Sequence, residues 1–332
     1  MKEAELYKKV NNKVQCNACA HRCIIDKGKR GICGVRENKD GKLYLLVYEK
    51  ISAYNIDPIE KKPLFHFHPG KKVLSLGTVG CNFKCDFCQN WEISQSPKTN
   101  NSILGKKIKI KEIVKTAVEN NCLGIAYTYN EPAVFIEFAH DIAVEAKKNG
   151  LKNIFVSNGF ETKEALDYVA GKIDAMNIDL KSFSDDFYKK YCGGRLQPVL
   201  DTIKRLKEKK IWIEITTLII PGLNDSNEEL KKISKFIASI DKNIPWHIIK
   251  FFPCYKMQDI EPTPEKILHK AHDIGKASGL KHVYIGNVRN GRESTLCPNC
   301  NEICIERDGF TSKIRLKNGK CPKCGKEVKG KW

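Results

Sequence analysis

The chain has 332 residues and a formal net charge of +19, from 58 Lys and Arg against 39 Asp and Glu. No stretch approaches the ~18 consecutive apolar residues of a membrane-spanning helix, and the first residues do not resemble a signal peptide. The sequence therefore argues against a membrane protein, and we expect a cytoplasmic protein with one large domain and small appendages. The positive charge favours an anionic partner such as RNA, a phosphorylated substrate or an acidic protein, although a solvated lysine-rich surface explains it equally well.

Most of the fifteen cysteines stand in closely spaced groups, which in a large chain without a secretory signal favours metal-binding thiolates over disulfides. The first group lies in residues 1–65 and consists of Cys16, Cys19, Cys23 and Cys33. Four thiolates at this spacing can bind one zinc ion or an iron–sulfur cluster, in a module too small to form its own core. We favour structural zinc here and keep a second cluster as the alternative.

The second group follows an apolar run, Val73–Gly77, that predicts a short strand. Cys81, Cys85 and Cys88 have CxxxCxxC spacing on the loop after this run. Three thiolates can hold three irons of a 4Fe-4S cluster and leave the fourth iron open to a small molecule, whereas a structural zinc site needs four protein ligands. The alternative is a zinc site that takes a fourth cysteine from elsewhere in the chain.

Residues 66–292 alternate between strand-like and helix-like segments. Apolar and β-branched runs predict seven strands, at Val73–Leu76, Leu123–Thr128, Asn153–Ser157, Ala175–Asp179, Ile211–Leu218, His247–Phe251 and His282–Ile285. Helical spacing predicts the segments between them, at Ile110–Asn121, Pro132–Asn149, Lys163–Val169, Val199–Lys209, Ser226–Ile240 and Pro264–Ala277. This order is typical of an α/β barrel that is one strand short of closure, and ligands bind such folds past the carboxyl ends of the strands.

Residues 293–332 contain two CPxC knuckles, formed by Cys297, Cys300, Cys321 and Cys324 around a β-prone segment. This spacing predicts a zinc ribbon. Cys304 is a spare cysteine that could replace a ligand or be buried. Such ribbons are structural in most cases, and contact with RNA or protein is a further hypothesis.

The cysteine loop, with Phe87 before its last cysteine, resembles that of the radical S-adenosylmethionine (radical SAM) superfamily. The resemblance implies a partial (β/α) TIM-like barrel in which the open iron binds S-adenosylmethionine (SAM). It also implies reductive cleavage of SAM to a 5′-deoxyadenosyl radical, which abstracts hydrogen from a substrate. A low-potential electron donor such as ferredoxin or flavodoxin would supply the electron.

Segments just past the predicted strands carry the rest of this resemblance. The family's usual Gly-Gly-Glu-Pro segment is replaced by Tyr-Asn-Glu-Pro at 129–132, so we expect the side-chain oxygen of Asn130 to contact the amino group of SAM together with Glu131. The Asp-Leu-Lys segment at 179–181 resembles one in the glycyl-radical-enzyme activases. The implied cofactor contacts are Asn130, Glu131, Ser157, Asn158, Asp179 and Lys181.

Over nearly the whole chain, the order of motifs resembles the radical SAM enzyme of the AmmeMemoRadiSam system, which is related to pyruvate formate-lyase activating enzyme. The matching pieces are Cys16–Arg36, Asp57–Pro63, Gly80–Asn90, Tyr129–Pro132 and the ribbon that ends at Trp332. This resemblance implies association with Memo-type and AMMECR-type proteins, and it carries no established substrate.

Three functions are therefore open. The leading hypothesis is a radical SAM enzyme that acts on a macromolecule or an anionic metabolite. The second is an activase that installs a glycyl radical on a partner enzyme. The third is a non-catalytic RNA- or protein-binding protein whose cysteine groups all hold zinc.

Overall fold

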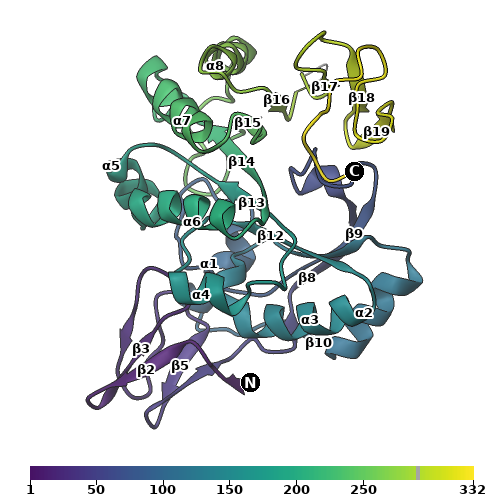
Figure 1. Cartoon of the computed structure of the whole chain (residues 1–332). Coiled ribbons are helices and arrows are strands. Elements are labelled where there is room, and N and C mark those ends of the chain that lie inside the picture. The colour runs from purple at the N-terminus through teal and green to yellow at the C-terminus, as the bar shows by residue number, and fades with distance from the viewer. Residues whose placement is uncertain (289–291) are drawn as a thin grey trace.

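The computed structural model of the chain describes residues 1–288 and 292–332, and its centre is a curved eight-stranded sheet (Figure 1). Seven strands run parallel and in chain order: β9 (Lys72–Gly77), β11 (Gly124–Tyr127), β12 (Lys152–Ser157), β13 (Ala175–Asp179), β14 (Trp212–Ile219), β15 (Trp246–Lys250) and β16 (Val283–Gly286). β8 (Ala53–Pro58) pairs antiparallel with β9 at one edge, and β16 forms the other edge. The seven predicted strands are confirmed, and the sheet is a partial barrel.

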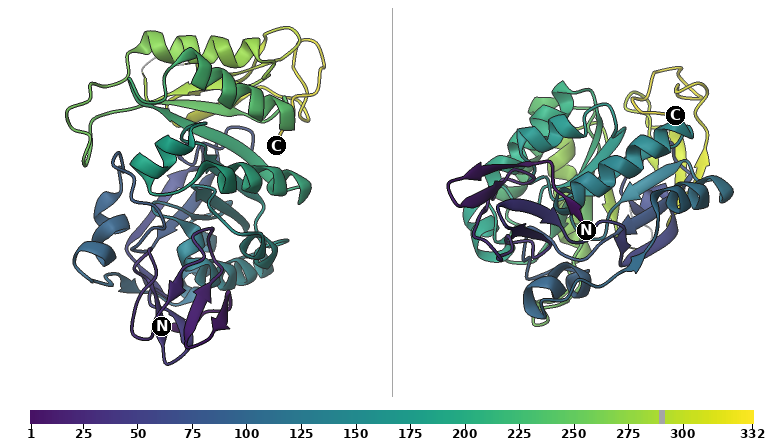
Figure 2. Two further views of the ribbon diagram at one scale, coloured as in Figure 1. Left: turned by 90° about the vertical axis from the view of Figure 1, so that its left-hand side faces the viewer. Right: turned by 90° about the horizontal axis from the view of Figure 1, so that it is seen from below.

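Helices lie along the outer side of this sheet and connect successive strands (Figures 1 and 2). They are α2 (Ile110–Glu119), α3 (Ile136–Lys148), α4 (Lys163–Tyr168), α6 (Leu196–Glu208), α7 (Asn227–Ile240) and α8 (Glu265–Ala277). α7 shows why the sequence forms them: the Ser226 hydroxyl accepts the Glu229 N–H at 3.2 Å, and Leu230, Ile233 and Ile237 bury one face. All six predicted helices are confirmed.

The parallel strands are buried on both faces. β9 is buried from Val73 to Gly77, and every residue of β11 is buried. One face of the sheet packs against helices such as α3, and the other faces the barrel interior, which explains the nearly continuous apolar runs in the sequence. Polar groups on the loops therefore gather at the strand ends.

The N-terminal region is built from short strands on one side of the barrel. Their bounds are β1 (Lys2–Glu3), β2 (Tyr7–Val10), β3 (Lys13–Cys16), β4 (Ile24–Ile25), β5 (Arg36–Lys39), β6 (Lys42–Leu45) and β7 (Lys50–Ile51), with β10 (Lys106–Lys107) paired to β7. They form two three-stranded sheets, β1-β6-β5 and β2-β3-β4. β8 lies within the predicted 1–65 module but belongs to the barrel sheet, and the boundary at 65 stays a prediction.

Several short elements had no signal in the sequence pattern. They are η1 (Ile59–Lys61), α1 (Trp91–Thr99), α5 (Asp185–Phe187) and a π-helical turn at Tyr188–Cys192, whereas η2 (Pro132–Phe135) is the first turn of the helix predicted from Pro132. α1 contains Pro97 and follows the cysteine loop directly, so neither apolar period nor propensity marks it. A π-helical turn needs an extra residue in a helix and is frequent at functional sites.

The C-terminal ribbon contains β17 (Thr295–Leu296), β18 (Ile303–Asp308) and β19 (Thr311–Ile314). It packs on the loop before β9: the Arg307 guanidinium lies 4.1 Å from the centroid of the Phe65 ring, and the Lys331 N–H donates to the His66 carbonyl at 2.7 Å. The predicted boundary at 292 adjoins residues 289–291, which lie outside the described chain.

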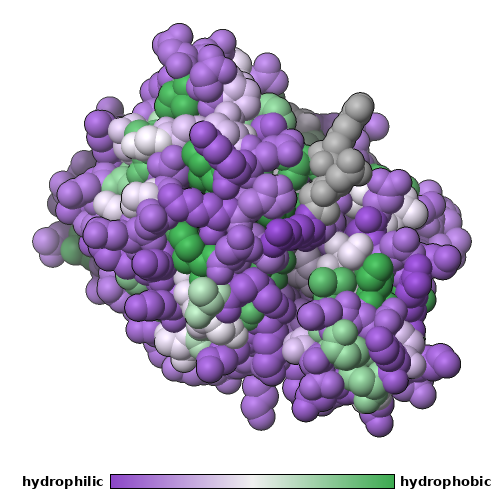
Figure 3. Space-filling model, turned by 90° about the horizontal axis from the view of Figure 1, so that it is seen from above, coloured by the Kyte–Doolittle hydropathy of each residue, from purple (hydrophilic) through white to green (hydrophobic). Residues whose placement is uncertain are grey.

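Hydrophobic residues on the upper face of the molecule form small patches separated by hydrophilic surface (Figure 3). Within the described residues, no helix has the length and apolar character needed to cross a membrane.

Candidate active site

A cavity of about 590 Å³ opens at the carboxyl ends of the parallel strands. The cysteine loop forms one wall, the loops after β11, β12 and β13 form another, and the ribbon contributes Glu293 and Phe310. All nine residues predicted for the cluster and the cofactor line it: Cys81, Cys85, Cys88, Asn130, Glu131, Ser157, Asn158, Asp179 and Lys181. A volume of this size is ordinary for a site that binds a cofactor-sized molecule.

The cysteine loop is held by backbone hydrogen bonds to distant segments. The Gly80 N–H donates to the Ile93 carbonyl of α1 at 2.9 Å. The N–H groups of Lys84 and Asp86 donate to two successive carbonyls at the end of the π-helical turn, Cys192 at 2.8 Å and Tyr191 at 3.0 Å. These contacts fix the loop while its three thiols face the cavity.

The spacing of the three thiols fits a cluster better than a single ion. Among the described residues, only the ribbon cysteines form a group whose ligand atoms all lie within 4.8 Å of one another. Each thiolate of a 4Fe-4S cluster binds a separate iron at a corner of a cube, so its sulfurs stand farther apart than around one ion. Burial raises the pKa of Cys81 and Cys88, so bound iron would be what keeps them ionised.

Two cysteines that look isolated in the sequence lie against this loop. The Cys192 thiol contacts Cys85, and this contact together with burial raises the pKa of Cys85. The Cys254 thiol donates to the Phe87 carbonyl at 3.3 Å. Cys192 is buried, and spacing along the chain could not show either contact, because only the fold brings residues 100 or more positions apart to one loop.

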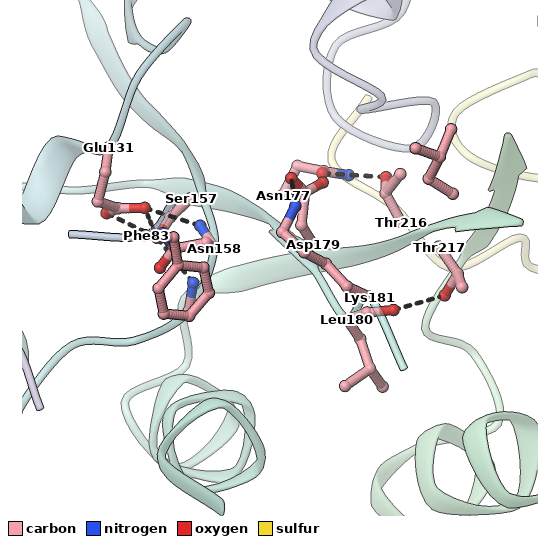
Figure 4. A network of polar contacts seen from close by, with 12 residues as sticks. Phe83, Glu131, Ser157, Asn158, Asn177, Asp179, Leu180, Lys181, Thr216 and Thr217 are labelled. Carbon is pink, nitrogen blue, oxygen red and sulfur yellow. Dashed lines mark hydrogen bonds and ion pairs between the residues drawn. The ribbon is translucent and has the colours of Figure 1, made fainter. Parts of the chain in front are cut away.

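Glu131 is the centre of a buried polar network at the ends of β11 and β12 (Figure 4). Its carboxylate accepts the Ala133 N–H at 2.9 Å, which caps η2, and the Asn158 N–H at 2.8 Å. The Ser157 hydroxyl lies 3.0 Å from Glu131 and 2.6 Å from Glu161. Burial and the Glu161 carboxylate raise the pKa of Glu131 to about 8, and burial also raises that of Glu161. An ammonium group entering the cavity would favour the ionised form of this pair.

Asn130 and Asn158 brace the cysteine loop. The Asn130 amide donates to the Gly80 carbonyl at 2.6 Å, and its side-chain oxygen accepts the Thr78 N–H at 3.2 Å. The Asn158 amide donates to the Asn82 side-chain oxygen at 2.7 Å. The Asn130 oxygen, expected to contact SAM, is thus engaged inside the protein, because it stands where it can close the turn before Cys81.

Tyr129 adopts a backbone conformation that favours glycine. Its φ of 71° is in the left-handed region, which costs a residue with a side chain of order 1–3 kcal/mol. The Tyr129 hydroxyl donates to Asp57 at 2.8 Å, and the Lys62 amine lies 4.9 Å from the centroid of its ring. Lys62 is itself buried and donates to Asp57 at 2.7 Å. Sequence reasoning missed this support, although Asp57 and Lys62 lie within a segment quoted for the resemblance.

Asp179 and Lys181 pair with each other at the end of β13. The Lys181 amine lies 2.9 Å from the Asp179 carboxylate and 5.7 Å from the centroid of the Phe87 ring. Burial opposes the charge of Lys181, but Asp179 and the nearby Cys85 outweigh it and raise the pKa of the amine. A fixed positive charge therefore faces the cavity beside the cysteine loop.

The floor of the cavity is a polar set that the sequence pattern did not reveal. The Thr216 hydroxyl donates to Asn177 at 3.0 Å, and the His247 ring lies 2.7 Å from Glu214. These residues lie within buried strands and point into the barrel. The sequence signal that could have revealed them was the alternation of side chains between the two faces of each strand. His66 is buried and bonds to the Lys329 carbonyl at 2.7 Å.

The ribbon cysteines form a separate, compact group. Cys297 and Cys324 have their sulfurs 3.6 Å apart, and so have Cys300 and Cys321. Sulfurs at the corners of a zinc tetrahedron with 2.3 Å bonds are about 3.8 Å apart, so the group fits the predicted zinc. Cys304 lies buried outside the tetrad, in a small core with Val328. The cysteines of the N-terminal group line a third place, a separate pocket.

Comparison with known proteins agrees with this geometry. The profile described as Radical SAM superfamily matches residues 75–237. An uncharacterized protein of Methanocaldococcus jannaschii is 45% identical over 99% of both chains. The pyruvate formate-lyase-activating enzyme of Staphylococcus epidermidis is 22% identical over 61% of this chain and 88% of its own.

Among solved structures, Streptococcus suis SuiB bound to S-adenosylmethionine superposes with a TM-score of 0.51 and 14% identity, over 69% of this chain and 53% of that one. At this identity the likeness concerns the fold alone. The sequence match, the parallel partial barrel and the cysteine loop at its strand ends agree: the chain belongs to the radical SAM superfamily.

Proposed function

We propose that the protein is an enzyme that binds a 4Fe-4S cluster through Cys81, Cys85 and Cys88 and cleaves SAM reductively. The observation that carries the proposal is that three thiols of one loop, whose sulfurs do not all lie within 4.8 Å of one another, share a cavity with a buried carboxylate and a fixed ammonium group. Membership of the superfamily implies both cofactors. When bound, they supply a 5′-deoxyadenosyl radical that abstracts hydrogen from the substrate.

The two ends of the amino-acid part of SAM match charges in the cavity. Glu131 can accept from its ammonium group, and this contact would relieve the repulsion between Glu131 and Glu161. Lys181 can pair with its carboxylate as a compact cation. Ser157 and Asn158 hold Glu131 in place from β12. Asn130 acts on the loop that carries Cys81, so its contribution is to position the cluster.

The substrate enters the remaining space between the barrel floor and the ribbon. Asn177, Thr216 and His247 offer hydrogen-bonding groups there, and Phe310 offers an apolar face. Because the chain carries a net charge of +19, we expect the substrate to be an anionic metabolite, an acidic protein or a nucleic acid. A low-potential ferredoxin or flavodoxin and proteins of the Memo and AMMECR types remain proposed partners.

A second candidate is a glycyl-radical-enzyme activase. The Asp179–Lys181 pair and the similarity to the Staphylococcus epidermidis pyruvate formate-lyase-activating enzyme favour it. The two additional cysteine groups are unlike the simplest activases. Electron paramagnetic resonance of a candidate glycyl-radical partner after turnover would decide: a carbon-centred doublet on the partner supports the activase, and its absence during active SAM cleavage favours the first proposal.

The decisive test is formation of 5′-deoxyadenosine by anaerobic, iron-loaded protein supplied with SAM and dithionite. We expect product from the wild type, a loss of at least 100-fold in Cys88→Ala, and near-normal yield in Cys122→Ala. Cys122 is a buried cysteine outside the cavity wall, which makes it a matched control. Wild-type protein that binds iron but gives no product with any donor would count against the proposal, and protein that binds only zinc would favour a non-catalytic zinc protein.

A further inference from the structure

The four N-terminal cysteines line one pocket that has no part in the cavity described above. Cys16, Cys19, Cys23 and Cys33 surround it together with apolar residues such as Ile25 and Val134. Cys16 and Cys33 are buried, and the other two are partly buried. Its lining combines residues of the two small N-terminal sheets with Ala133 and Val134 of η2, so its walls come from the module and the barrel together.

The same chain supplies a reference for what a zinc site looks like in this structure. In the ribbon, all four thiols lie within 4.8 Å of one another, with two sulfur pairs at 3.6 Å. In the N-terminal group, no three of the thiols meet that criterion in the part of the chain that the structure describes. In every trio of these four thiols, at least one pair of sulfurs therefore stands more than 4.8 Å apart. This is the arrangement needed when each sulfur binds a different iron.

We propose that Cys16, Cys19, Cys23 and Cys33 bind a second 4Fe-4S cluster, fully ligated by protein, instead of zinc. Four protein thiolates leave no open iron, so this cluster would carry electrons and would not bind SAM. The inference replaces the zinc favoured from the sequence, because spacing along the chain does not report how far apart the sulfurs stand in space.

The surroundings suit an anionic cluster. Arg36 lines the pocket, and its guanidinium is buried against Cys16 and Cys33. It donates to the Val134 carbonyl at 3.0 Å and pairs with Glu137 of α3. Its position beside the thiolates would offset part of the negative charge of the cluster in a dry site.

The second site touches the loop of the first. The His21 ring, between Cys19 and Cys23, bonds to the carbonyl of Asn82 at 2.9 Å. Gly80 of the cysteine loop also packs so closely on this group that an added Cβ would stand 2.7 Å from the Cys33 carbonyl. The two ligand loops are thus adjacent, and the clusters would sense each other's unpaired electrons.

The test is metal counting and electron paramagnetic resonance on full-length protein purified anaerobically from cells supplied with both metals. We expect about eight irons and one zinc per chain in the wild type, because each cluster holds four irons. Cys19→Ala should lower iron by about half and leave zinc unchanged, whereas Cys300→Ala should lower zinc alone. In reduced wild-type protein the signal should show two interacting centres, and Cys19→Ala should simplify it to one.

A second variant keeps the inference falsifiable if Cys19→Ala does not fold. Cys88→Ala removes a ligand of the first site and should retain about four irons with the signal of an isolated cluster. A wild-type protein with about four irons and two zincs would overturn the inference, as would a Cys88→Ala protein that holds zinc at the N-terminal group and no iron.

Discussion

The ribbon and the cysteine loop both present thiols for metal, but they hold these thiols in different ways. In the ribbon the bonds are local: the Cys297 N–H donates to Glu302 at 2.8 Å, and the Cys321 N–H donates to Lys326 at 2.9 Å. In the cysteine loop the partners are remote, since Lys84 and Asp86 bond to residues more than 100 positions away. A short motif therefore encodes the first site, whereas the second depends on the whole barrel.

Arg36→Gln is the substitution with the largest expected effect, because it removes the ion pair between the N-terminal module and α3. Arg36 and Glu137 have side chains only 2% and 0% exposed, so the substitution leaves an unpaired buried carboxylate. We expect a loss of about 3–5 kcal/mol in the free energy of unfolding, measured by denaturant titration. Zinc in the ribbon should stay bound.

A double variant, Arg36→Gln with Glu137→Gln, should recover part of this loss because it removes the stranded charge. If the double variant is less stable than Arg36→Gln alone, the pair is not the source of the effect.

Gly80→Ala should be the next largest change, and Gly325→Ala of the ribbon is its matched control. Both glycines have positive φ, but a Cβ at Gly80 would stand 2.6 Å from Val35, whereas Gly325 has nothing within 4 Å. We expect Gly80→Ala to cost about 3 kcal/mol or more and Gly325→Ala about 1 kcal/mol. Iron content should fall in the first variant only; equal effects would show that the loop can move without cost.

A smaller effect concerns pH. Because the pKa of Glu131 is raised to about 8, the folded protein holds a proton that the unfolded chain releases near pH 4.5. The contribution of Glu131 to the free energy of unfolding is therefore complete below pH 4.5 and is lost as the pH rises through 8. In protein without SAM, Tm should fall between pH 6 and pH 8.5, and it should fall less in Glu161→Gln. Parallel pH profiles for the two proteins would contradict the assigned repulsion.

The smallest expected effect is at the ribbon surface. Arg315 and Glu306 form an ion pair with side chains 40% and 46% exposed, so Arg315→Gln should change stability by less than about 1 kcal/mol. Thermal unfolding at low and high salt measures this change. A loss comparable to that of Arg36→Gln would mean that the ribbon is as tightly coupled to the fold as the N-terminal module.

Much of the fold could be predicted because strands and helices of the barrel follow simple apolar periods. Cys81, Cys85, Cys88 and Glu131 could be located from short motifs, and the structure places them on one cavity. The support for Tyr129, the place of Cys192 and the floor residue His247 could not, because each depends on contacts between segments far apart in the chain. The spacing of the N-terminal thiols is likewise a property of three-dimensional packing.

The π-helical turn at Tyr188–Cys192 has a consequence for how the chain can change in length. It holds one residue more than an α-helical turn, and its last two carbonyls receive the N–H groups of the cysteine loop. Deleting Lys190 would return the turn to α-helical winding and rotate those carbonyls by about 100°. None of the predicted ligands lies in this turn, yet the number of its residues sets the position of the cysteine loop at the candidate active site. Natural relatives should therefore tolerate substitutions there far better than single-residue deletions.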